Sequence, residues 1–213
     1  MRVGILGSGL MGGKLGTIFA RAGHEVTFSY ARSEQKLRRL AQEAQGNARA
    51  GTPGEAAHDA DALLLAVHWS RVDDVLLQAG DVSGRVVVTC SLPTSDDYSL
   101  VIGHTSSGAE ALAEKLKHAQ VVSAFGTVPS EVFFGVFDAR RRANRPSLVY
   151  CGDHSRAKEV ATTLIRDAGF DPVDAGPLRI ARFMGPFALL MGQLAYEGDE
   201  GPEIAYRFER FGR

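Results

Sequence analysis

The sequence predicts an α/β fold in which a doubly wound, parallel sheet is covered by helices on both faces. Three observations carry this prediction. Short apolar runs alternate with segments whose apolar residues recur at helical spacing. Two of these runs, 62–67 and 86–89, are almost continuously apolar, as is typical of strands that are buried on both faces of a sheet. A turn rich in glycine directly follows the first run.

The first part of the chain is predicted to alternate strands and helices. The predicted strands cover 3–6, 26–28, 47–50, 62–67, 86–89 and 120–125, and helical stripes cover 15–22, 37–44 and 107–119. Strands that alternate with helices in this way belong to a parallel sheet whose connections cross over through the helices.

The pattern changes after residue 125. A loop rich in Gly, Pro and Phe and an arginine-rich stretch at 140–145 precede a predicted strand at 148–151, a helix at 155–168 and a short strand at 170–173. A last apolar helix is expected over 179–196, kinked or restarted at Pro186 because proline lacks the amide hydrogen of a helix interior. We therefore predict a first domain over 1–125 and a small C-terminal α+β lobe over 126–213.

Composition narrows the partners and the location. The 24 basic residues nearly balance the 25 acidic ones, so no overall field attracts nucleic acid or an anionic membrane. No stretch reaches the roughly 18 apolar residues of a membrane span, and we expect no secretory peptide, hence a cytoplasmic location. Cys90 and Cys151 have no second Cys or His at metal-ligand spacing, so we expect buried thiols and no metal site.

The glycine-rich turn between the first strand and the first helix reads Gly7-Ser8-Gly9-Leu10-Met11-Gly12. Gly7 allows the tight turn, Gly9 lets the backbone approach a pyrophosphate, and Gly12 permits close packing of helix on strand. The amides and partial positive charge of the helix N-terminus favour phosphate. A glycine turn without a ligand is the alternative, but strand, spacing and helix together favour a Rossmann dinucleotide site.

The end of the second strand indicates which dinucleotide binds. An NAD enzyme usually places an Asp or Glu there for the adenosine 2′-hydroxyl, whereas this chain reads Phe28-Ser29-Tyr30-Ala31-Arg32-Ser33. Arg32 can grip a 2′-phosphate with its planar guanidinium, Ser33 can donate a hydroxyl bond and Lys36 can add charge. We therefore expect NADP(H); in the alternative, Arg32 and Lys36 are merely solvated residues at a helix start.

Two more strand ends are expected to face the nicotinamide half of the cofactor. Val67-His68-Trp69 follows the fourth predicted strand and Cys90-Ser91-Leu92-Pro93 follows the fifth, and ligands of such sheets bind outside the carboxyl ends of the strands. Trp69 could wall the pocket by aromatic packing. A lone His beside a Trp more often packs or hydrogen-bonds than relays protons, so we assign no catalytic residue.

Together these residues resemble the NADP oxidoreductases that depend on the deazaflavin coenzyme F-420, and their relatives. The resemblance covers nearly the whole chain. It rests on Met1-Arg2-Val3, Gly23-His24-Glu25-Val26, Ala66-Val67-His68-Trp69, Val122-Ser123-Ala124-Phe125-Gly126-Thr127-Val128-Pro129, Val149-Tyr150-Cys151-Gly152-Asp153, and, most specifically, Asp174-Ala175-Gly176-Pro177-Leu178 followed by Ala181-Arg182.

The resemblance implies a Rossmann domain with a small C-terminal lobe, a cleft between them, a homodimer, and direct hydride transfer between NADPH and a flavin-like ring. The implied NADP contacts are the turn Ser8 to Met11, then Tyr30, Ala31, Arg32, Lys36, Val67 and Leu92, and the segment Gly126 to Ser130 with Val128. The second ring, coenzyme F-420 or a flavin such as FMN or FAD, would lie over the nicotinamide against that segment and the C-terminal helix.

One position departs from this pattern. The deazaflavin enzymes of the family carry His where this chain has Gly126, and relatives that reduce ordinary flavins, including the cytosolic domains of membrane metalloreductases, tend to carry Asn. The resemblance therefore leaves open whether the acceptor is a deazaflavin or a flavin.

The chemistry fits the absence of a catalytic constellation. Hydride passes between two rings stacked at roughly 3–3.5 Å, which is a task of positioning and requires no acid–base residue. Two alternatives remain. An NADP-dependent dehydrogenase of a small hydroxy or imino acid shares the glycine loop but normally carries a larger helical second domain. A non-enzymatic NADP(H) sensor would signal through the helix at 179–196.

Overall fold

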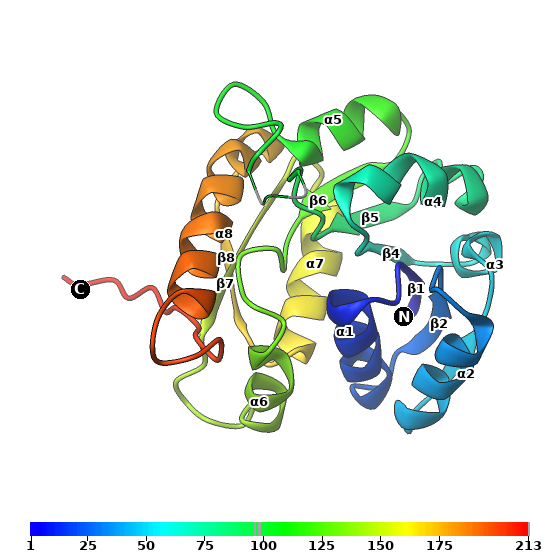
Figure 1. The fold of residues 1–213 in the computed structure, drawn as a ribbon, viewed down its shortest axis with the longest axis horizontal. Coiled ribbons are helices and arrows are strands. Elements are labelled where there is room, and N and C mark those ends of the chain that lie inside the picture. Colours follow the sequence, from blue (N-terminus) through cyan, green and yellow to red (C-terminus); the bar gives the residue numbers. More distant parts are fainter. Residues whose placement is uncertain (96, 98, 213) are drawn as a thin grey trace.

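The computed structural model describes residues 1–95, 97 and 99–212. Within these residues one eight-stranded sheet has the order β3-β2-β1-β4-β5-β6-β7-β8. Its strands are β1 (Arg2–Leu6), β2 (Glu25–Ser29), β3 (Ala48–Ala50), β4 (Ala62–Leu65), β5 (Val86–Thr89), β6 (Gln120–Ser123), β7 (Ser147–Gly152) and β8 (Asp171–Asp174). Figure 1 shows the sheet between two layers of helices, so the predicted α/β class with a Rossmann-type sheet is confirmed.

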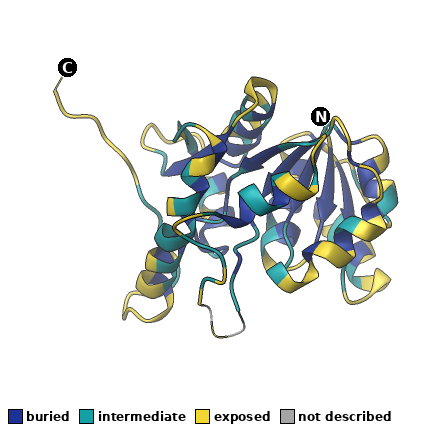
Figure 2. Cartoon of the chain, turned by 90° about the horizontal axis from the view of Figure 1, so that it is seen from above, coloured by how far each residue is buried: buried dark blue, intermediate teal, exposed yellow. Residues whose placement is uncertain are grey.

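Helices cover both faces of the sheet and enclose two apolar clusters. One face carries α1 (Leu10–Arg21), α2 (Glu34–Glu43), α6 (Val132–Asp138) and α7 (Ser155–Asp167); the other carries α3 (Pro53–His58), α4 (Val72–Ala79), α5 (Gly108–Lys115) and α8 (Ala181–Tyr196). The 3-10 turns η1 (Trp69–Arg71) and η2 (Leu178–Ile180) precede α4 and α8. Figure 2 shows the strands buried between the layers. In the part of the chain described, no helix is both long and apolar enough to cross a bilayer.

The register of the sheet brings five strand ends to one edge. Leu6 lies opposite Ser29 on one side and opposite Leu65 on the other. Leu65 pairs with Thr89, and Thr89 pairs with Ser123. Because these strands are parallel, the segments that follow them all start at the same edge. The strand order reverses beside β1, and such a reversal is where an α/β sheet leaves a ligand crevice.

Beyond β6 the two strands that the sequence assigned to a C-terminal lobe extend the same sheet. β7 runs antiparallel to β6, with Ser123 opposite Cys151, and β8 then runs parallel to β7. A run of buried residues has the same pattern whichever way its strand points, and an antiparallel strand flanking a parallel sheet is common. Since β7 and β8 extend the sheet of the first part, the division between 1–125 and 126–213 stays a prediction.

Two local differences occur just after β6. Residues 132–138 form α6, where the sequence predicted only a loop. At seven residues this helix is shorter than the window in which helical periodicity shows, although Phe133 and Phe137 bury one side of it. The strand predicted over 120–125 ends at Ser123, because Phe125 turns the chain with a φ of 66°.

A row of aromatic rings holds Phe125 in this left-handed conformation. Its ring meets Phe19 of α1 at 6.0 Å and Phe133 of α6 at 6.4 Å, both edge-on, and Phe133 meets Phe170 at 6.1 Å. A bulky residue with positive φ costs about 1–3 kcal/mol. Edge-to-face pairs contribute about 0.5–1.5 kcal/mol each, so the row offsets this strain. It also joins α1 to the C-terminal part of the chain.

His24 forms a second tie between distant segments. Its Nε2 lies 2.9 Å from the carboxylate of Asp167 at the end of α7, and its ring meets Phe19 edge-on at 5.9 Å. Burial lowers the pKa of His24 below its ordinary 6.5, and the bond to Asp167 opposes this shift in part. The ring is therefore more easily protonated in the unfolded chain than in the folded one.

We expect this difference to make stability depend on pH. Near pH 6.5 the unfolded chain binds more protons at His24 than the folded chain does. The free energy of unfolding is therefore highest above that pH, and it decreases as the pH falls through the lower pKa of His24 in the folded protein. His24→Gln should flatten the loss of unfolding free energy between about pH 7.5 and 5.5, measured by urea denaturation. An unchanged slope in His24→Gln would contradict the assignment.

Candidate active site

The glycine loop between β1 and α1 is shaped by two close approaches. Gly7 has a φ of 113°, and a Cβ on it would lie 2.5 Å from the carbonyl oxygen of Ala66. A Cβ on Gly12 would lie 1.9 Å from the carbonyl oxygen of Gly7. Gly9 differs, because a Cβ there would meet no described atom within 4 Å. The fold itself therefore requires Gly7 and Gly12, whereas the space in front of Gly9 is open to a ligand.

This open space lies at the N-terminus of α1. The helix begins at Leu10 with the exposed Gly9 as its N-cap residue, and within the described chain no side chain caps it and no acidic residue stands in its first turn. The first-turn amides of Leu10, Met11 and Gly12 have no acceptor within the helix, and the helix dipole adds partial positive charge. These features fit the pyrophosphate of a dinucleotide.

Ser8, which was predicted to contact the cofactor, is fully buried. Its hydroxyl donates to the carbonyl oxygen of Ser29 at 2.8 Å, and its amide donates to that of Tyr30 at 3.1 Å. The hydroxyl of Ser29 in turn donates to the carbonyl oxygen of Ile5 at 2.6 Å. These bonds fasten the loop to the end of β2. Ser8 thus shapes the loop, and its contact with the cofactor stays a prediction.

The residues after β2 present two cations whose charge is not compensated. In the described ranges, the side chains of Arg32 and Lys36 have no hydrogen-bond or ion-pair acceptor. Glu34, the first carboxylate after β2, is engaged by Arg38 at 2.6 Å. Ser33 is the N-cap residue of α2, and its hydroxyl oxygen accepts from the amide of Lys36 at 3.3 Å. Such a patch of free positive charge suits a phosphate group.

Tyr30 and Asp74 connect two elements of the crevice. Tyr30 has a φ of 55°, and its carbonyl accepts the amide bond from Ser8. Its hydroxyl donates to the carboxylate of Asp74 in the first turn of α4. Burial, together with this bond, raises the pKa of Tyr30, so the phenol stays protonated. The tie fixes the end of β2 relative to α4.

The ends of β4 and β5 are joined by Ser91, whose hydroxyl donates to the carbonyl oxygen of Val67 at 2.7 Å. His68 is exposed, and its Nδ1 lies 3.0 Å from the hydroxyl of Ser70. Trp69 is partly buried and packs against the apolar cluster on the sheet face that carries α3, α4, α5 and α8. His68 therefore has a hydrogen-bond partner within its own turn, and Trp69 walls this end of the sheet.

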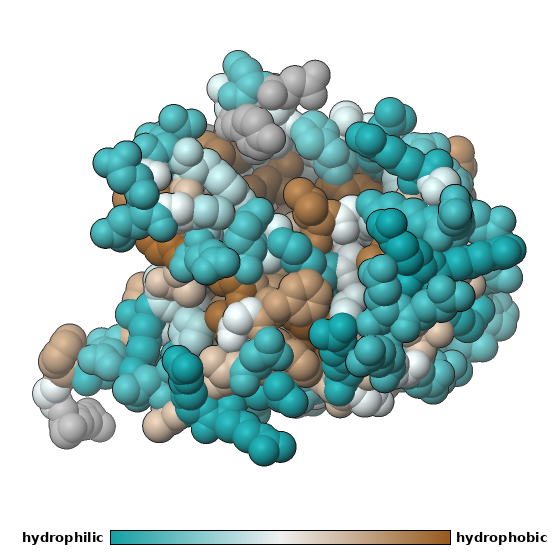
Figure 3. Space-filling model, turned by 60° about the horizontal axis from the view of Figure 1, so that its bottom comes forward, coloured by the Kyte–Doolittle hydropathy of each residue, from teal (hydrophilic) through white to brown (hydrophobic). Residues whose placement is uncertain are grey.

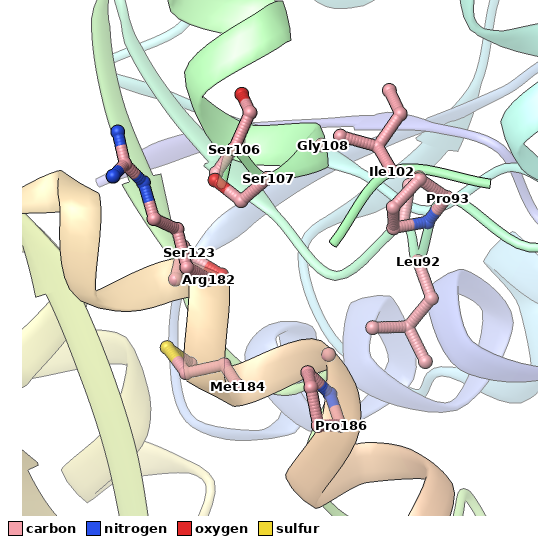
Figure 4. Close-up of a pocket in the computed structure, with 14 residues that line it drawn as sticks. Leu92, Pro93, Ile102, Ser106, Ser107, Gly108, Ser123, Arg182, Met184 and Pro186 are labelled. Carbon is pink, nitrogen blue, oxygen red and sulfur yellow. The ribbon is translucent and has the colours of Figure 1, made fainter. Parts of the chain in front are cut away.

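A hollow opens between the end of β5, the start of α5 and the start of α8; we call it the α5–α8 hollow. Its apolar wall consists of Leu92, Pro93, Ile102, Met184 and Pro186, and its polar wall of Ser106, Ser107, Ser123 and Arg182 (Figure 4). Its volume of about 20 Å³ holds about one water-sized group. On the face seen in Figure 3, apolar side chains gather in a furrow between hydrophilic surfaces.

An ion pair between α5 and α8 holds the polar wall. Nε and Nη2 of Arg182 donate to the two carboxylate oxygens of Glu110 over 2.7–3.1 Å. Ser107 accepts from the amide of Glu110 at 3.1 Å and donates to its carboxylate at 2.9 Å. The bond from Arg182 lowers the pKa of Glu110, which therefore stays ionised. The guanidinium is fixed at the rim of the hollow with its charge partly balanced.

The segment 126–130 is held from two sides. Nζ of Lys14, on α1, donates to the carbonyl oxygen of Ser130 at 3.0 Å and to its hydroxyl at 3.1 Å. The side chain of Val128 is buried in the apolar cluster on the sheet face that carries α1, α2, α6 and α7. Only the backbone of Val128 can therefore contact a cofactor. Gly126 is partly exposed, and a Cβ there would lie 3.6 Å from Leu92 Cδ2.

Sequence reasoning did not find four side chains that fix this site, namely Lys14, Asp74, Glu110 and Tyr206. Only Glu110 carried a signal, because Ser107 followed three residues later by Glu is the pattern of a capping box. Lys14, Asp74 and Tyr206 bond to partners 116, 44 and 79 residues away in the chain. No local pattern indicates such pairings.

The described residues offer no metal centre or reactive thiol. In the described ranges no three His, Cys, Asp or Glu side chains lie where they could hold a metal ion. Cys90 and Cys151 are free and buried, as predicted. Burial raises the pKa of each thiol to about 12, so both stay neutral. The site therefore offers binding surfaces more than acid–base or nucleophilic groups.

The profile of one protein family matches residues 2–93, and its description reads NADP oxidoreductase coenzyme F420-dependent. Together with the Rossmann-type sheet and the glycine loop, this match defines the class of NADP-dependent oxidoreductases. Residues 2–93 of the chain match the model of the coenzyme F-420-dependent NADP oxidoreductase family. The resemblance inferred from the sequence is thereby confirmed.

Several known proteins are similar to the chain over most of its length. Metalloreductase STEAP3 of Rattus norvegicus is 29% identical over 181 residues, which are 85% of this chain and 35% of the rat protein, so the chain spans about a third of that relative. A hypothetical protein from Sinorhizobium meliloti is 26% identical with a TM-score of 0.75, covering 85% of this chain and 88% of its own.

Two further structures are similar in fold alone. A candidate F420-dependent NADP reductase from Arthrobacter sp. FB24 has a TM-score of 0.85 at 20% identity, covering 99% of this chain and 100% of its own. A reductive aminase from Aspergillus terreus, solved with NADPH and ethyl-5-oxohexanoate, has a TM-score of 0.66 at 17% identity, covering 90% of this chain and 61% of its own.

The two kinds of glycine in the loop should respond differently to substitution. At Gly9 the added methyl group of Gly9→Ala would point into open space, and the φ of −78° is ordinary for alanine, so the thermal unfolding temperature should stay unchanged. The NADPH affinity, measured by calorimetry, should fall on the order of 10- to 100-fold, because hydrogen bonds to the phosphate are lost. Gly12→Ala should destabilise the fold by at least about 1–3 kcal/mol. Wild-type affinity in a folded Gly9→Ala would contradict a pyrophosphate site here.

Proposed function

We propose that the protein binds NADP(H) at the glycine loop and passes hydride between it and a tricyclic ring of the deazaflavin or flavin type at the α5–α8 hollow. The observation that carries this proposal is the placement of two complementary surfaces at one sheet edge. The open N-terminus of α1 suits a pyrophosphate, and the half-apolar, half-polar hollow suits the edge of a conjugated ring. The match to the family model over residues 2–93 supports NADP(H) as the first of the two ligands.

In this proposal each part of NADP(H) has its own contact. The pyrophosphate meets the amides from Leu10 to Gly12. The 2′-phosphate meets the free cations Arg32 and Lys36, with Ser33 able to donate its hydroxyl. The nicotinamide lies beside Leu92, where β5 ends. Tyr30, Ala31, Val67 and the segment 126–130 line the same edge of the sheet.

The α5–α8 hollow is too small for a whole tricyclic ring, but it accommodates a substituent of one. Deazaflavins and flavins share a pyrimidine-dione edge that bears two carbonyl oxygens. Hydroxyls of the polar wall and the guanidinium of Arg182 can donate to such oxygens, while Leu92 and Pro186 offer apolar contact to the ring. The ring would then lie across the mouth of the hollow with its polar edge inward.

The task of this chain is to hold two rings against each other and to exclude water. The nicotinamide supplies a hydride when bound, and with one solvent proton the acceptor ring gains two electrons and two hydrogens. Two rings held at roughly 3–3.5 Å react without a general acid or base on the protein. Arg182 would in addition stabilise negative charge that develops on the acceptor's carbonyl edge.

Gly126 bears on the choice of acceptor. A Cβ at this position would lie 3.1 Å from the carbonyl oxygen of Cys90, which is a tight contact. On the side of Leu92 it would lie 3.6 Å from Cδ2, which is an ordinary van der Waals distance. With glycine there, this rim of the cleft carries no side chain that selects between a deazaflavin and a flavin. We therefore propose both ring types as acceptors, with apolar shape and the carbonyl edge as the shared recognition elements.

An acceptor assay tests this function. We expect NADPH oxidation, followed at the nicotinamide absorbance band, to accelerate on addition of coenzyme F-420, FMN or FAD. A ferric chelate tests direct metal reduction, and a small imine or hydroxy acid tests the dehydrogenase alternative. If NADPH binds but none of the rings is reduced faster than without protein, the reductase function fails. Binding without turnover of any acceptor favours an NADP(H) sensor.

The 2′-phosphate assignment has its own test. Arg32→Ala should weaken NADPH by about 1.5–3 kcal/mol more than it weakens NADH, because only NADPH carries the phosphate that a charged hydrogen bond would hold. Arg39, an exposed residue of the following helix α2 that is paired with Glu43 at 3.6 Å, is the matched control, and Arg39→Ala should leave both affinities unchanged. Equal weakening of NADPH and NADH in Arg32→Ala would overturn the assignment.

A further inference from the structure

The C-terminal segment returns to the sheet after α8 and inserts Tyr206 beside the candidate acceptor site. The backbone there is fastened at Ser147, the first residue of β7. The amide of Ser147 donates to the carbonyl oxygen of Tyr206 at 2.8 Å, and the amide of Phe208 donates to the hydroxyl of Ser147 at 3.0 Å. Tyr206 contacts both apolar clusters of the molecule. Residues 209–212 then run out into solvent (Figures 1 and 2).

The hydroxyl of Tyr206 bridges two elements. It accepts from the amide of Val149 at 3.1 Å and shares a hydrogen bond of 2.8 Å with the hydroxyl of Thr127, which is buried. Burial raises the pKa of Tyr206, so the phenol keeps its proton. Thr127 follows Gly126 directly, and Gly126 lies against Leu92 in the wall of the cleft.

The ring of Tyr206 packs on the opposite wall. It meets the ring of Phe187 edge-on with centroids 4.9 Å apart, and it meets Phe208 at 5.3 Å. Phe187 follows Pro186 directly, and Pro186 lines the α5–α8 hollow. The side chain of Tyr206 thus contacts Thr127, next to Gly126, through its hydroxyl, and Phe187, next to Pro186, through its ring.

We infer that Tyr206 is a positioning residue that sets the separation between the two walls of the acceptor site, the segment 126–130 and the start of α8. This inference rests on the proposed function, because it concerns the acceptor of that same reaction. Hydride transfer is steep in distance, so a shift of a few tenths of an ångström between the walls weakens the stacking of the acceptor ring. NADP(H) is proposed to be held mainly by the glycine loop and the cations after β2, so its affinity depends less on this separation than the affinity for the acceptor does.

The test removes single hydroxyls. Tyr206→Phe keeps the ring on Phe187 and loses the bridge, and Thr127→Val removes its other end at nearly constant shape. We expect each variant to raise the acceptor KM about 3- to 10-fold, the range expected for one net hydrogen bond, and to weaken NADPH binding by a smaller factor. Because the two hydroxyls act through one bond, the double variant should resemble either single one.

A binding measurement separates this inference from the proposed reaction. Trp69 is the single tryptophan of the sequence, and its ring would lie 3.2 Å from a Cβ on Gly108, which lines the hollow. Quenching of its fluorescence by FMN or coenzyme F-420, in the presence of NADP⁺ so that nothing turns over, gives the acceptor Kd. This Kd should rise with the KM in Tyr206→Phe and Thr127→Val.

Tyr150 supplies the matched control. It is buried, and its hydroxyl accepts a bond of 2.9 Å from Thr162 on α7, away from both walls. Tyr150→Phe should lower the melting temperature about as much as Tyr206→Phe and leave the acceptor KM and Kd unchanged. A general loss of stability therefore cannot imitate the expected result.

The outcomes distinguish the two claims. Acceptor binding without NADPH oxidation in the wild type contradicts the proposed reaction, and the Kd values of the variants then decide on Tyr206 alone. Unchanged Kd and KM in Tyr206→Phe, equal weakening by Tyr150→Phe, or additive effects of Tyr206→Phe and Thr127→Val would each overturn the positioning role. Failure of both rings to bind to the wild type would overturn it as well.

Discussion

The close approach of α1 to the first turn is the constraint on which the rest of the site depends. Only a missing Cβ at Gly12 lets the helix start within contact of the carbonyl of Gly7. That contact points the first-turn amides at the open space before Gly9. It also lets the helix begin at the same sheet edge where β2, β4, β5 and β6 end. Every other binding surface is placed relative to this helix terminus.

Two residues at this edge are held in conformations that their side chains disfavour. Tyr30 directly follows β2 with a positive φ, and Phe125 lies just after β6 with a positive φ as well. Each strained turn redirects the chain across the edge of the sheet, so that the following residues face the crevice. The surrounding structure supplies the stabilisation: Tyr30 bonds to Ser8 and Asp74, and Phe125 stands in a row of buried aromatic rings.

Some cationic side chains around the site are paired with other groups of the protein, and others are not. Lys14 is bonded to Ser130 and Arg182 is paired with Glu110, so each of these cations already has a partner within the protein. Arg32 and Lys36 have no such partners in the described ranges, so their charge is available to a ligand. Because a free cation gives up no contact within the protein when an anion binds, the 2′-phosphate contact is proposed at the residues after β2.

The sequence by itself determined the sheet and the glycine loop, and it predicted NADP(H) as the dinucleotide. Each rests on neighbouring residues: the buried runs, Gly7 to Gly12, and Arg32 where a carboxylate would otherwise stand. Only the tertiary structure decided the direction of β7, the helix α6, and the bonds of Lys14 and Tyr206 to the segment 126–130. Such contacts join residues far apart in the chain, and packing alone brings them together. A local pattern specifies that a side chain is polar or buried, but it does not specify the distant group that the side chain meets.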